Sequence, residues 1–165
     1  KIVQKTDKYP SLWQERILIR TASALHDIGK IGIDEAILNK PGRLTAEEFE
    51  SMKAHTTIGA DMLRNLPRYQ EERLLQIAIE ICRWHHERYD GKGYPDGLVG
   101  DEIPISAQLV SIADVYDALT SERVYKKAFS HEKAMQMIRE GECGAFNPLL
   151  LSCLEEIADE LQAEM

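Results

Sequence analysis

Apolar residues recur along the chain at intervals of three and four, the spacing of helices that bury one face. The clearest run lies near the middle of the chain, where one face carries Leu74, Leu75, Ile77, Ala78, Ile81 and Cys82. Convincing strand-like alternation of apolar and polar residues is absent from the sequence. The pattern therefore predicts an all-α domain of about six or seven helices.

Capping residues and helix breakers divide this pattern into elements. Capping boxes beginning at Ser11 and Thr45 predict one helix running to about Asp27 and a second passing through Met52. Further helices are expected around 58–66, 74–86 and 104–118, and two more after the N-cap candidates Ser130 and Asn147. Glycine and proline predict loops at 29–42 and 90–100.

Composition narrows the class of protein. The 165 residues are 44% apolar and 29% charged, which suits one soluble globular domain, and no apolar run is long enough to span a bilayer. The net charge of −8 disfavours binding to polymeric nucleic acid but leaves a small phosphorylated ligand open. Three cysteines without a Cys-x-x-Cys spacing indicate reduced thiols in the cytoplasm rather than disulfides or a zinc site.

Histidines and aspartates supply the candidate chemistry. Four histidines lie at or near predicted helix ends, where side chains can converge: His26, His55, His85 and His86. Asp27 follows His26 directly, and Asp114 and Asp117 are one turn apart on another helix. Imidazoles with carboxylates suit zinc, manganese or iron. Each feature also has a simpler explanation, such as favourable charge at a helix end or a solvated face, but Asp114 sits in an apolar run where an unpaired carboxylate would be costly.

The order of the motifs resembles that of HD-GYP domains, from about Leu25 to Leu154. The matching segments are His26-Asp27-Ile28-Gly29-Lys30, His55 after Met52-Lys53, His85-His86-Glu87-Arg88, Asp90-Gly91-Lys92-Gly93-Tyr94-Pro95 and the nine residues Ala113 to Ser121. The His-Asp pair alone would fit many HD-superfamily hydrolases, whereas the Gly93-Tyr94-Pro95 motif is far more specific.

The resemblance implies a compact helical HD domain with the glycine-rich loop at its active site. It also implies two divalent ions, three in some members, with iron or manganese the usual metals. The implied metal ligands are His26, Asp27, His55, His85, His86 and Asp114, with Asp27 bridging the ions. Asp27 and Lys30 are the implied catalytic residues, and the implied substrate-binding residues are Lys30, Gly93, Tyr94, Asp117, Arg123 and Lys126.

The activity implied is hydrolysis of the phosphodiester bonds of the bacterial messenger cyclic di-GMP to pGpG, GMP or both, by a metal-bridged hydroxide. The loop at Gly93 implies a diguanylate cyclase (GGDEF) domain as a partner. Two alternatives stay open: hydrolysis of another cyclic dinucleotide or nucleotide, and a catalytically silent module that binds the messenger or a cyclase domain. His131 matches no ligand and is expected at the surface.

The resemblance has one gap. HD-GYP domains usually carry a further helix before the His-Asp motif, with a histidine and often a glutamate, whereas residues 1–24 contain no histidine. We therefore expect residues 1–165 to form a single phosphohydrolase domain that lacks this first ligand-bearing helix and any upstream sensory domain. The His26 and Asp114 side of the site should be weakened first.

Overall fold

The computed structural model describes residues 2, 8–122 and 127–163, and within these residues the fold is all-α, as predicted. The longer helices are α1 (Pro10–Ser23), α3 (Ala46–Lys53), α4 (His55–Arg64), α5 (Arg73–Trp84), α6 (Ile105–Thr120), α7 (His131–Arg139) and α8 (Pro148–Glu156). The shorter elements are α2 (Glu35–Leu38), α9 (Ala158–Gln162) and the 3-10 turns η2 (Ile28–Gly32), η3 (Pro67–Tyr69) and η4 (Gly100–Glu102). No helix in this part of the chain is long and apolar enough to cross a membrane.

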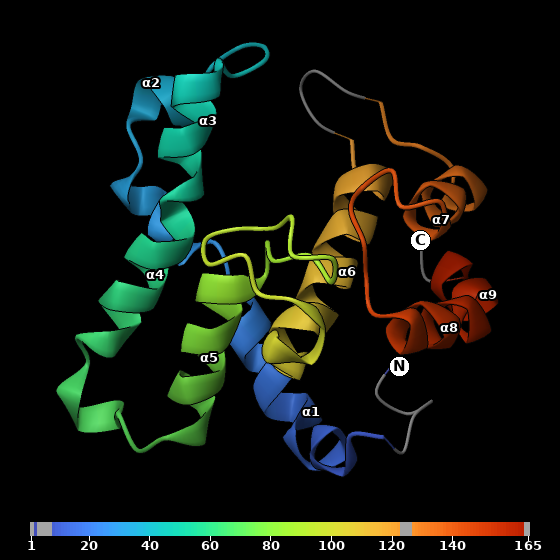
Figure 1. Ribbon diagram of the computed structural model, residues 1–165, viewed down its shortest axis with the longest axis horizontal. Helices are drawn as coiled ribbons and strands as arrows, with labels where there is room; N and C mark the ends of the chain where they lie inside the picture. Colours follow the sequence, from blue (N-terminus) through green and yellow to red (C-terminus); the bar gives the residue numbers. More distant parts are fainter. Residues whose placement is uncertain (1, 3–7, 123–126, 164–165) are drawn as a thin grey trace.

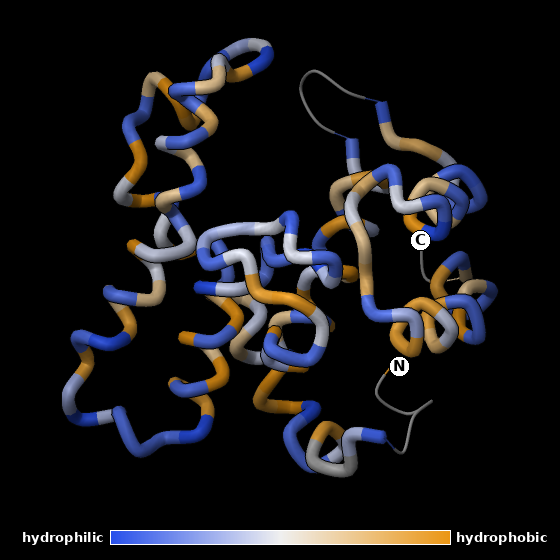
Figure 2. Tube along the Cα trace, viewed as in Figure 1, coloured by the Kyte–Doolittle hydropathy of each residue, from blue (hydrophilic) through white to orange (hydrophobic). Residues whose placement is uncertain are grey.

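Helix α5 lies near the centre of the molecule and contacts α1, α4 and α6, while α7 packs on α6 (Figure 1). The hydrophobic residues form two clusters, and Figure 2 shows them concentrated along α1, α5, α6 and α8. The first cluster joins α1, α4, α5 and α6 around residues such as Leu12, Ile77 and Ile81. The second joins α6, α7 and α8 around Ile112, Ile138 and others. The two clusters share α6 and, through Leu150 and Leu154, α8, so these two helices connect the site-bearing half of the fold with its C-terminal half.

A close backbone contact fixes η2 against α4. A Cβ atom at Gly29 would collide with the carbonyl oxygen of His55 and would lie 2.5 Å from the amide nitrogen of Gly59. Only glycine lets the two backbones approach this closely. Gly29 therefore holds the segment that carries Asp27 directly beside the start of α4.

Several boundaries differ from the sequence-based prediction. Helix α1 begins at Pro10, with Tyr9 at the N-cap, because proline is favoured in the first helical turn; the predicted capping box at Ser11 is wrong. The helix also ends at Ser23 rather than near Asp27. From Ala24 onward, hydrogen bonds to carbonyls three residues back replace the α-helical ones. The predicted loop 29–42 contains η2 and α2, and α9 follows α8. The capping box at Thr45 and the N-caps at Ser130 and Asn147 are confirmed.

The expected surface position of His131 is also wrong. Its residue is 8% exposed, and its Nδ1 lies 2.7 Å from the hydroxyl of Tyr116 on α6. The partner lies on another helix, so local sequence could not reveal that this histidine joins the core between α6 and α7.

Candidate metal centre

Three of the predicted ligand histidines are held in the same way at the ends of helices. The Nδ1 atom of His26 lies 2.8 Å from the carbonyl oxygen of Ser23, the last residue of α1. His55 makes the same contact with Met52 near the end of α3, at 2.7 Å. His85 makes it with Ile81 in the last turn of α5, at 2.9 Å.

These contacts determine which nitrogen of each imidazole carries the proton. A carbonyl oxygen can only accept, so Nδ1 must donate and a neutral ring keeps its lone pair on Nε2. Metal-binding histidines in proteins are commonly oriented by a hydrogen bond of this kind from the other ring nitrogen. The helix ends thus prepare three imidazoles to act as ligands through Nε2.

Four of the predicted ligands form one compact cluster. The candidate ligand atoms of Asp27, His55, His85 and His86 all lie within 4.8 Å of one another. Asp27 Oδ1 is 3.4 Å from His55 Nε2 and 3.9 Å from His85 Nε2. These residues come from the turn after α1, the start of α4 and the end of α5, so the cluster exists only because the three segments meet.

Three buried polar atoms of this cluster make no hydrogen bond within the part of the chain that the structure describes. Among the described residues, Asp27 Oδ1, His55 Nε2 and His85 Nε2 are buried without a hydrogen bond. Leaving such atoms unsatisfied costs about 1–3 kcal/mol each, so buried polar groups normally have partners. A divalent cation would satisfy all three atoms at once, and a set of imidazoles with one carboxylate suits zinc, manganese or iron. The residues present therefore fit a metal ion.

Burial also keeps these imidazoles in the form that binds metals. It is the main cause that lowers the pKa of His55 below its usual value, and with the charge of His26 it lowers the pKa of His85 to about 4. Burial and the proximity of His85 lower the pKa of His86 to about 2. A neutral imidazole is the ligand form, so no proton would have to be displaced at neutral pH.

The second oxygen of Asp27 faces a different group of residues. Asp27 Oδ2 lies 3.3 Å from His26 Nε2 and 2.5 Å from Lys30 Nζ, and His26 Nε2 lies 3.7 Å from Asp114 Oδ1. Hydrogen bonds to Asp114 and then Asp27 raise the pKa of His26 to about 10. Burial acts to raise the pKa of Asp27, but the bonds from His26 and Lys30 bring it below its ordinary value. Asp27 thus stands between two sets of potential ligands.

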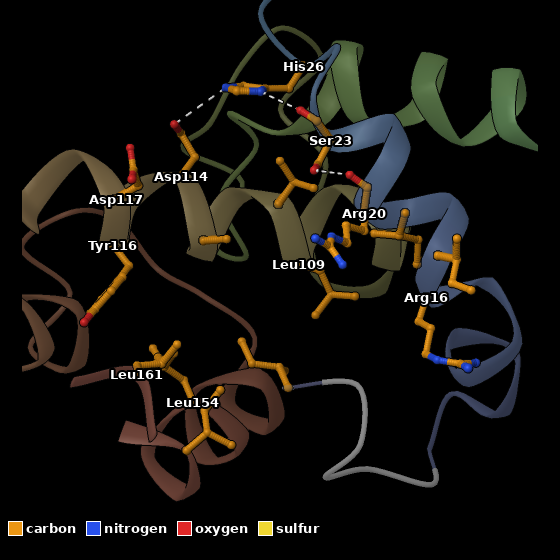
Figure 3. A pocket seen from close by; sticks show the side chains of 16 residues that line it. Arg16, Arg20, Ser23, His26, Leu109, Asp114, Tyr116, Asp117, Leu154 and Leu161 are labelled. Atoms are coloured by element: carbon orange, nitrogen blue, oxygen red, sulfur yellow. Dashed lines mark hydrogen bonds and ion pairs between the residues drawn. The ribbon is translucent and has the colours of Figure 1, made fainter. Parts of the chain in front are cut away.

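This second group opens onto a cavity of about 910 Å³ between α1, α6 and the C-terminal helices. Figure 3 shows His26 at its edge, joined by dashed lines to Asp114 and Ser23, with Leu154 and Leu161 on the opposite wall. Asp117 also lines the cavity and is exposed, one turn beyond Asp114. The His26 side is therefore far more open than the cluster around His85.

The glycine-rich loop lies against the compact cluster. The ring of Tyr94 stacks on that of His86, with centroids 4.8 Å apart and planes at 25°. A Cβ atom at Gly93 would collide with the backbone of Glu87 and Arg88, so glycine is needed for this approach. Arg123 and Lys126 lie outside the described residues.

One buried residue of this region received no role from the sequence. Glu87 is 2% exposed and accepts three backbone N–H bonds from the loop. The sequence does place this carboxylate between two histidines and a glycine-rich segment, and that position could have indicated its role. A buried carboxylate needs several hydrogen-bond donors, and loop amides can supply them.

Comparison with known proteins finds a family and several relatives for the chain. A family model described as "HD domain" matches residues 1–148. A cyclic di-GMP phosphodiesterase of Vibrio cholerae is 46% identical over 147 residues, covering 88% of this chain and 30% of the relative. A cyclic di-GMP phosphodiesterase of Thermotoga maritima is 45% identical over 143 residues, covering 87% and 38%.

A third relative is named for a different cyclic dinucleotide. A 3'3'-cGAMP-specific phosphodiesterase 2 of Vibrio cholerae is 42% identical over 149 residues, covering 90% of this chain and 28% of the relative. The chain thus spans about a third of the length of these relatives.

Proposed function

The chain belongs to the HD domain family, in its HD-GYP branch, and on this basis we propose that it is a metal-dependent phosphodiesterase that hydrolyses cyclic di-GMP. The observation that carries the proposal is the cluster of Asp27, His55, His85 and His86, with three buried atoms that lack partners among the described residues. Relatives named for this activity share more than two fifths of their matched residues with the chain.

We propose that the two oxygens of Asp27 serve two adjacent cations. His55, His85 and His86 would hold one ion, and His26 with Asp114 would hold the other. Bound divalent ions, manganese or iron in this proposal, would neutralise phosphate oxygens and supply a hydroxide nucleophile at neutral pH. The ion on the His26 side should be held less tightly, because its ligands are fewer and more exposed.

The remaining side chains would bind and orient the substrate. Lys30 places its ammonium beside Asp27, and 40% of its side chain is exposed, so it can reach an incoming phosphate as a compact positive charge. Tyr94 covers His86 and borders the cluster, where its ring or hydroxyl can contact the ligand. Asp117 lies at the more open side, one turn from Asp114. The products we propose are pGpG and, after a second cleavage, GMP.

A second candidate substrate is 3'3'-cGAMP, because several relatives are named for it. Relatives named as 3'3'-cGAMP-specific phosphodiesterases match the same region at up to 42% identity. Both molecules are cyclic dinucleotides with the same phosphodiester chemistry, so the metal cluster alone would serve either. Discrimination between them would depend on contacts with the bases.

The test is an assay of both cyclic dinucleotides with added Mn²⁺ or Fe²⁺ under reducing, anaerobic conditions. We expect the chain to release linear product from cyclic di-GMP faster than from 3'3'-cGAMP. The reverse preference would reassign the substrate. Binding of a cyclic dinucleotide with full metal occupancy but without product would instead favour a catalytically silent module.

We also propose a cytoplasmic location and, from the HD-GYP resemblance, contact between the glycine-rich loop and a diguanylate cyclase domain. The location rests on the cysteines: Cys82 and Cys153 are buried, which suits reduced thiols that pack as small apolar groups. Co-purification with a diguanylate cyclase domain, lost on substitution of the exposed loop residue Lys92, would support the partner.

A further inference from the structure

His86 is oriented differently from the other three histidines of the site. His26, His55 and His85 each donate from Nδ1 to a backbone carbonyl. Within the described part of the chain, neither ring nitrogen of His86 makes a hydrogen bond to a protein group. Its position in the cluster must therefore be fixed by packing.

The packing partner of His86 is Tyr94 of the glycine-rich loop. The two rings stack at a centroid distance of 4.8 Å, and the Tyr94 amide donates to the carbonyl of His86 at 3.3 Å. The ring of His86 also packs against those of His85 and His55, with centroids 4.1 and 5.1 Å apart. His86 thus contacts ligands that helices hold and a ring that the loop carries. The same ring also meets Phe49 of α3, with centroids 6.2 Å apart.

Glu87 fixes that loop. Its Oε1 accepts from the amides of Asp96 at 2.7 Å and Gly97 at 3.1 Å, and its Oε2 accepts from Leu98 at 3.1 Å. Hydrogen bonds to an ionised carboxylate are about twice as strong as neutral ones, and burial here excludes competing water. Three loop amides are therefore tied to the residue that directly follows His86.

We propose that Glu87 is a positioning residue for the metal centre, acting through Tyr94 on His86. This inference rests on the proposed function, since it concerns the ion that His86 would hold. The Glu87 carboxylate fixes the loop backbone, and the loop holds the Tyr94 ring against the imidazole of His86. This contact keeps the imidazole close to Asp27. Residues that orient metal ligands from outside typically change metal affinity by roughly 10- to 100-fold when substituted.

The main variant is Glu87→Gln, which keeps the shape but replaces one accepting oxygen with an NH2 group that cannot accept from an amide. Glu102→Gln is the matched control. Glu102 also accepts a backbone N–H of this loop, from Val99 at 2.9 Å, but it is exposed and does not contact His86 or Tyr94. Tyr94→Phe and Tyr94→Ala form a second pair, the first keeping the stacked ring and the second removing it.

Two measurements separate positioning from general loosening of the fold. Calorimetric titration with Mn²⁺ reports the metal affinity. Emission of Trp84 reports the loop, because its indole donates to Asp96 at 2.7 Å, and a Trp13→Phe background leaves it as the single tryptophan of the sequence. Far-UV circular dichroism checks that the helices are retained.

We expect Glu87→Gln to change the Trp84 emission and weaken Mn²⁺ binding roughly 10- to 100-fold with helicity intact. Tyr94→Ala should weaken binding similarly, while Tyr94→Phe and Glu102→Gln should stay close to the parent. The inference is overturned if Tyr94→Ala or a folded Glu87→Gln binds Mn²⁺ like the parent, or if Glu102→Gln weakens binding equally. Should Glu87→Gln not fold, the Tyr94 pair decides. A parent that binds no Mn²⁺ would instead overturn the proposed function itself.

Discussion

The two sides of Asp27 differ in how the protein treats its ligand atoms. On one side, His55 and His85 are each 1% exposed, and their Nε2 atoms have no hydrogen-bond partner among the described residues. On the other side, 25% of the His26 side chain and 27% of the Asp114 side chain are exposed, and the two form an ion pair. One side depends on a cation to satisfy its polar atoms, whereas the other already satisfies itself.

In the absence of metal, the two sides therefore carry different free-energy penalties. The buried side leaves polar atoms desolvated and unpaired, so a cation relieves an energetic penalty as it binds. On the open side a cation must displace the proton that His26 shares with two carboxylates, since those carboxylates raise the pKa of His26 to about 10. We expect tighter binding on the buried side, and four experiments test the comparison of the two sides.

The largest effect should come from the residue that both sides share. Asp27→Asn removes the negative charge and replaces one of the two oxygens with an NH2 group that cannot hold a cation. We expect cyclic dinucleotide hydrolysis to fall about 1000-fold, because metal ions contribute several kcal/mol to stabilising a phosphoryl transition state. The measurement is initial rate together with metal content by atomic emission. Asp61→Asn, at an exposed residue paired with Arg64, is the control and should leave both values unchanged.

A steric change should destabilise the buried side without substituting any candidate ligand. Gly29→Ala would drive a methyl group into the backbone of His55 and Gly59, and we expect a loss of about 3 kcal/mol in the free energy of unfolding. Urea denaturation measures this loss. At Gly32 the nearest atom is the Ile58 side chain, at 2.9 Å, which can shift, so Gly32→Ala should cost less than about 1 kcal/mol. Equal losses would show that the η2–α4 contact is not special.

Removing one histidine from each side tests the difference directly. We expect His85→Ala to weaken the tighter Mn²⁺ site at least roughly 100-fold, the upper range for changes outside the ligand shell. His26→Ala should spare that site and abolish only the weaker one. Calorimetric titration of both variants distinguishes the sites by stoichiometry. Loss of the tighter site in His26→Ala would show that the His26 side, and not the His85 side, binds Mn²⁺ more tightly.

The smallest effect concerns Cys82, whose Sγ donates to the Leu25 carbonyl at 3.0 Å beneath the buried side. Burial, with a contribution from the Asp27 charge, raises the pKa of this thiol from 9.0 to about 12. The unfolded chain therefore ionises first, so this stabilising contribution is complete below pH 9 and is lost as the pH rises toward 12. Urea denaturation at pH 8 and 10 should show a larger loss for the parent than for Cys82→Ala. An identical pH dependence would contradict the raised pKa.

The sequence could predict the helices and the ligand candidates for separate reasons. Apolar periodicity predicted α5, because Ile77, Ile81 and Cys82 repeat on one face that is indeed buried. The end of α1 was misplaced, since nothing in the sequence distinguishes α-helical bonds from the tighter turns that begin near Ala24. Helix existence depends on local pattern, whereas helix ends depend on a few hydrogen bonds.

The site shows the same limit. Order and spacing of the motifs predicted that His26, His55 and His85 would converge, and they do lie around Asp27. The sequence did not indicate that each ring would donate to a helix-terminal carbonyl, nor that Glu87 would accept three loop amides. The imidazole contacts are local, to carbonyls three or four residues back, but they form only where a helix ends beside the histidine. The Glu87 contacts depend on how the loop folds back over this residue, which no residue type specifies.

The bonds from the imidazoles to the ends of α1, α3 and α5 have a consequence for changes in chain length. Each residue of an α-helix adds about 100° of rotation and 1.5 Å of rise. Inserting or deleting one residue within α5 would therefore swing His85 out of the cluster while the helix itself survived. Length variation should be confined to segments such as the turn around Gly42, where a Cβ atom meets nothing within 4 Å. The lengths of α1, α3 and α5 therefore determine whether the three imidazoles meet at the candidate metal centre.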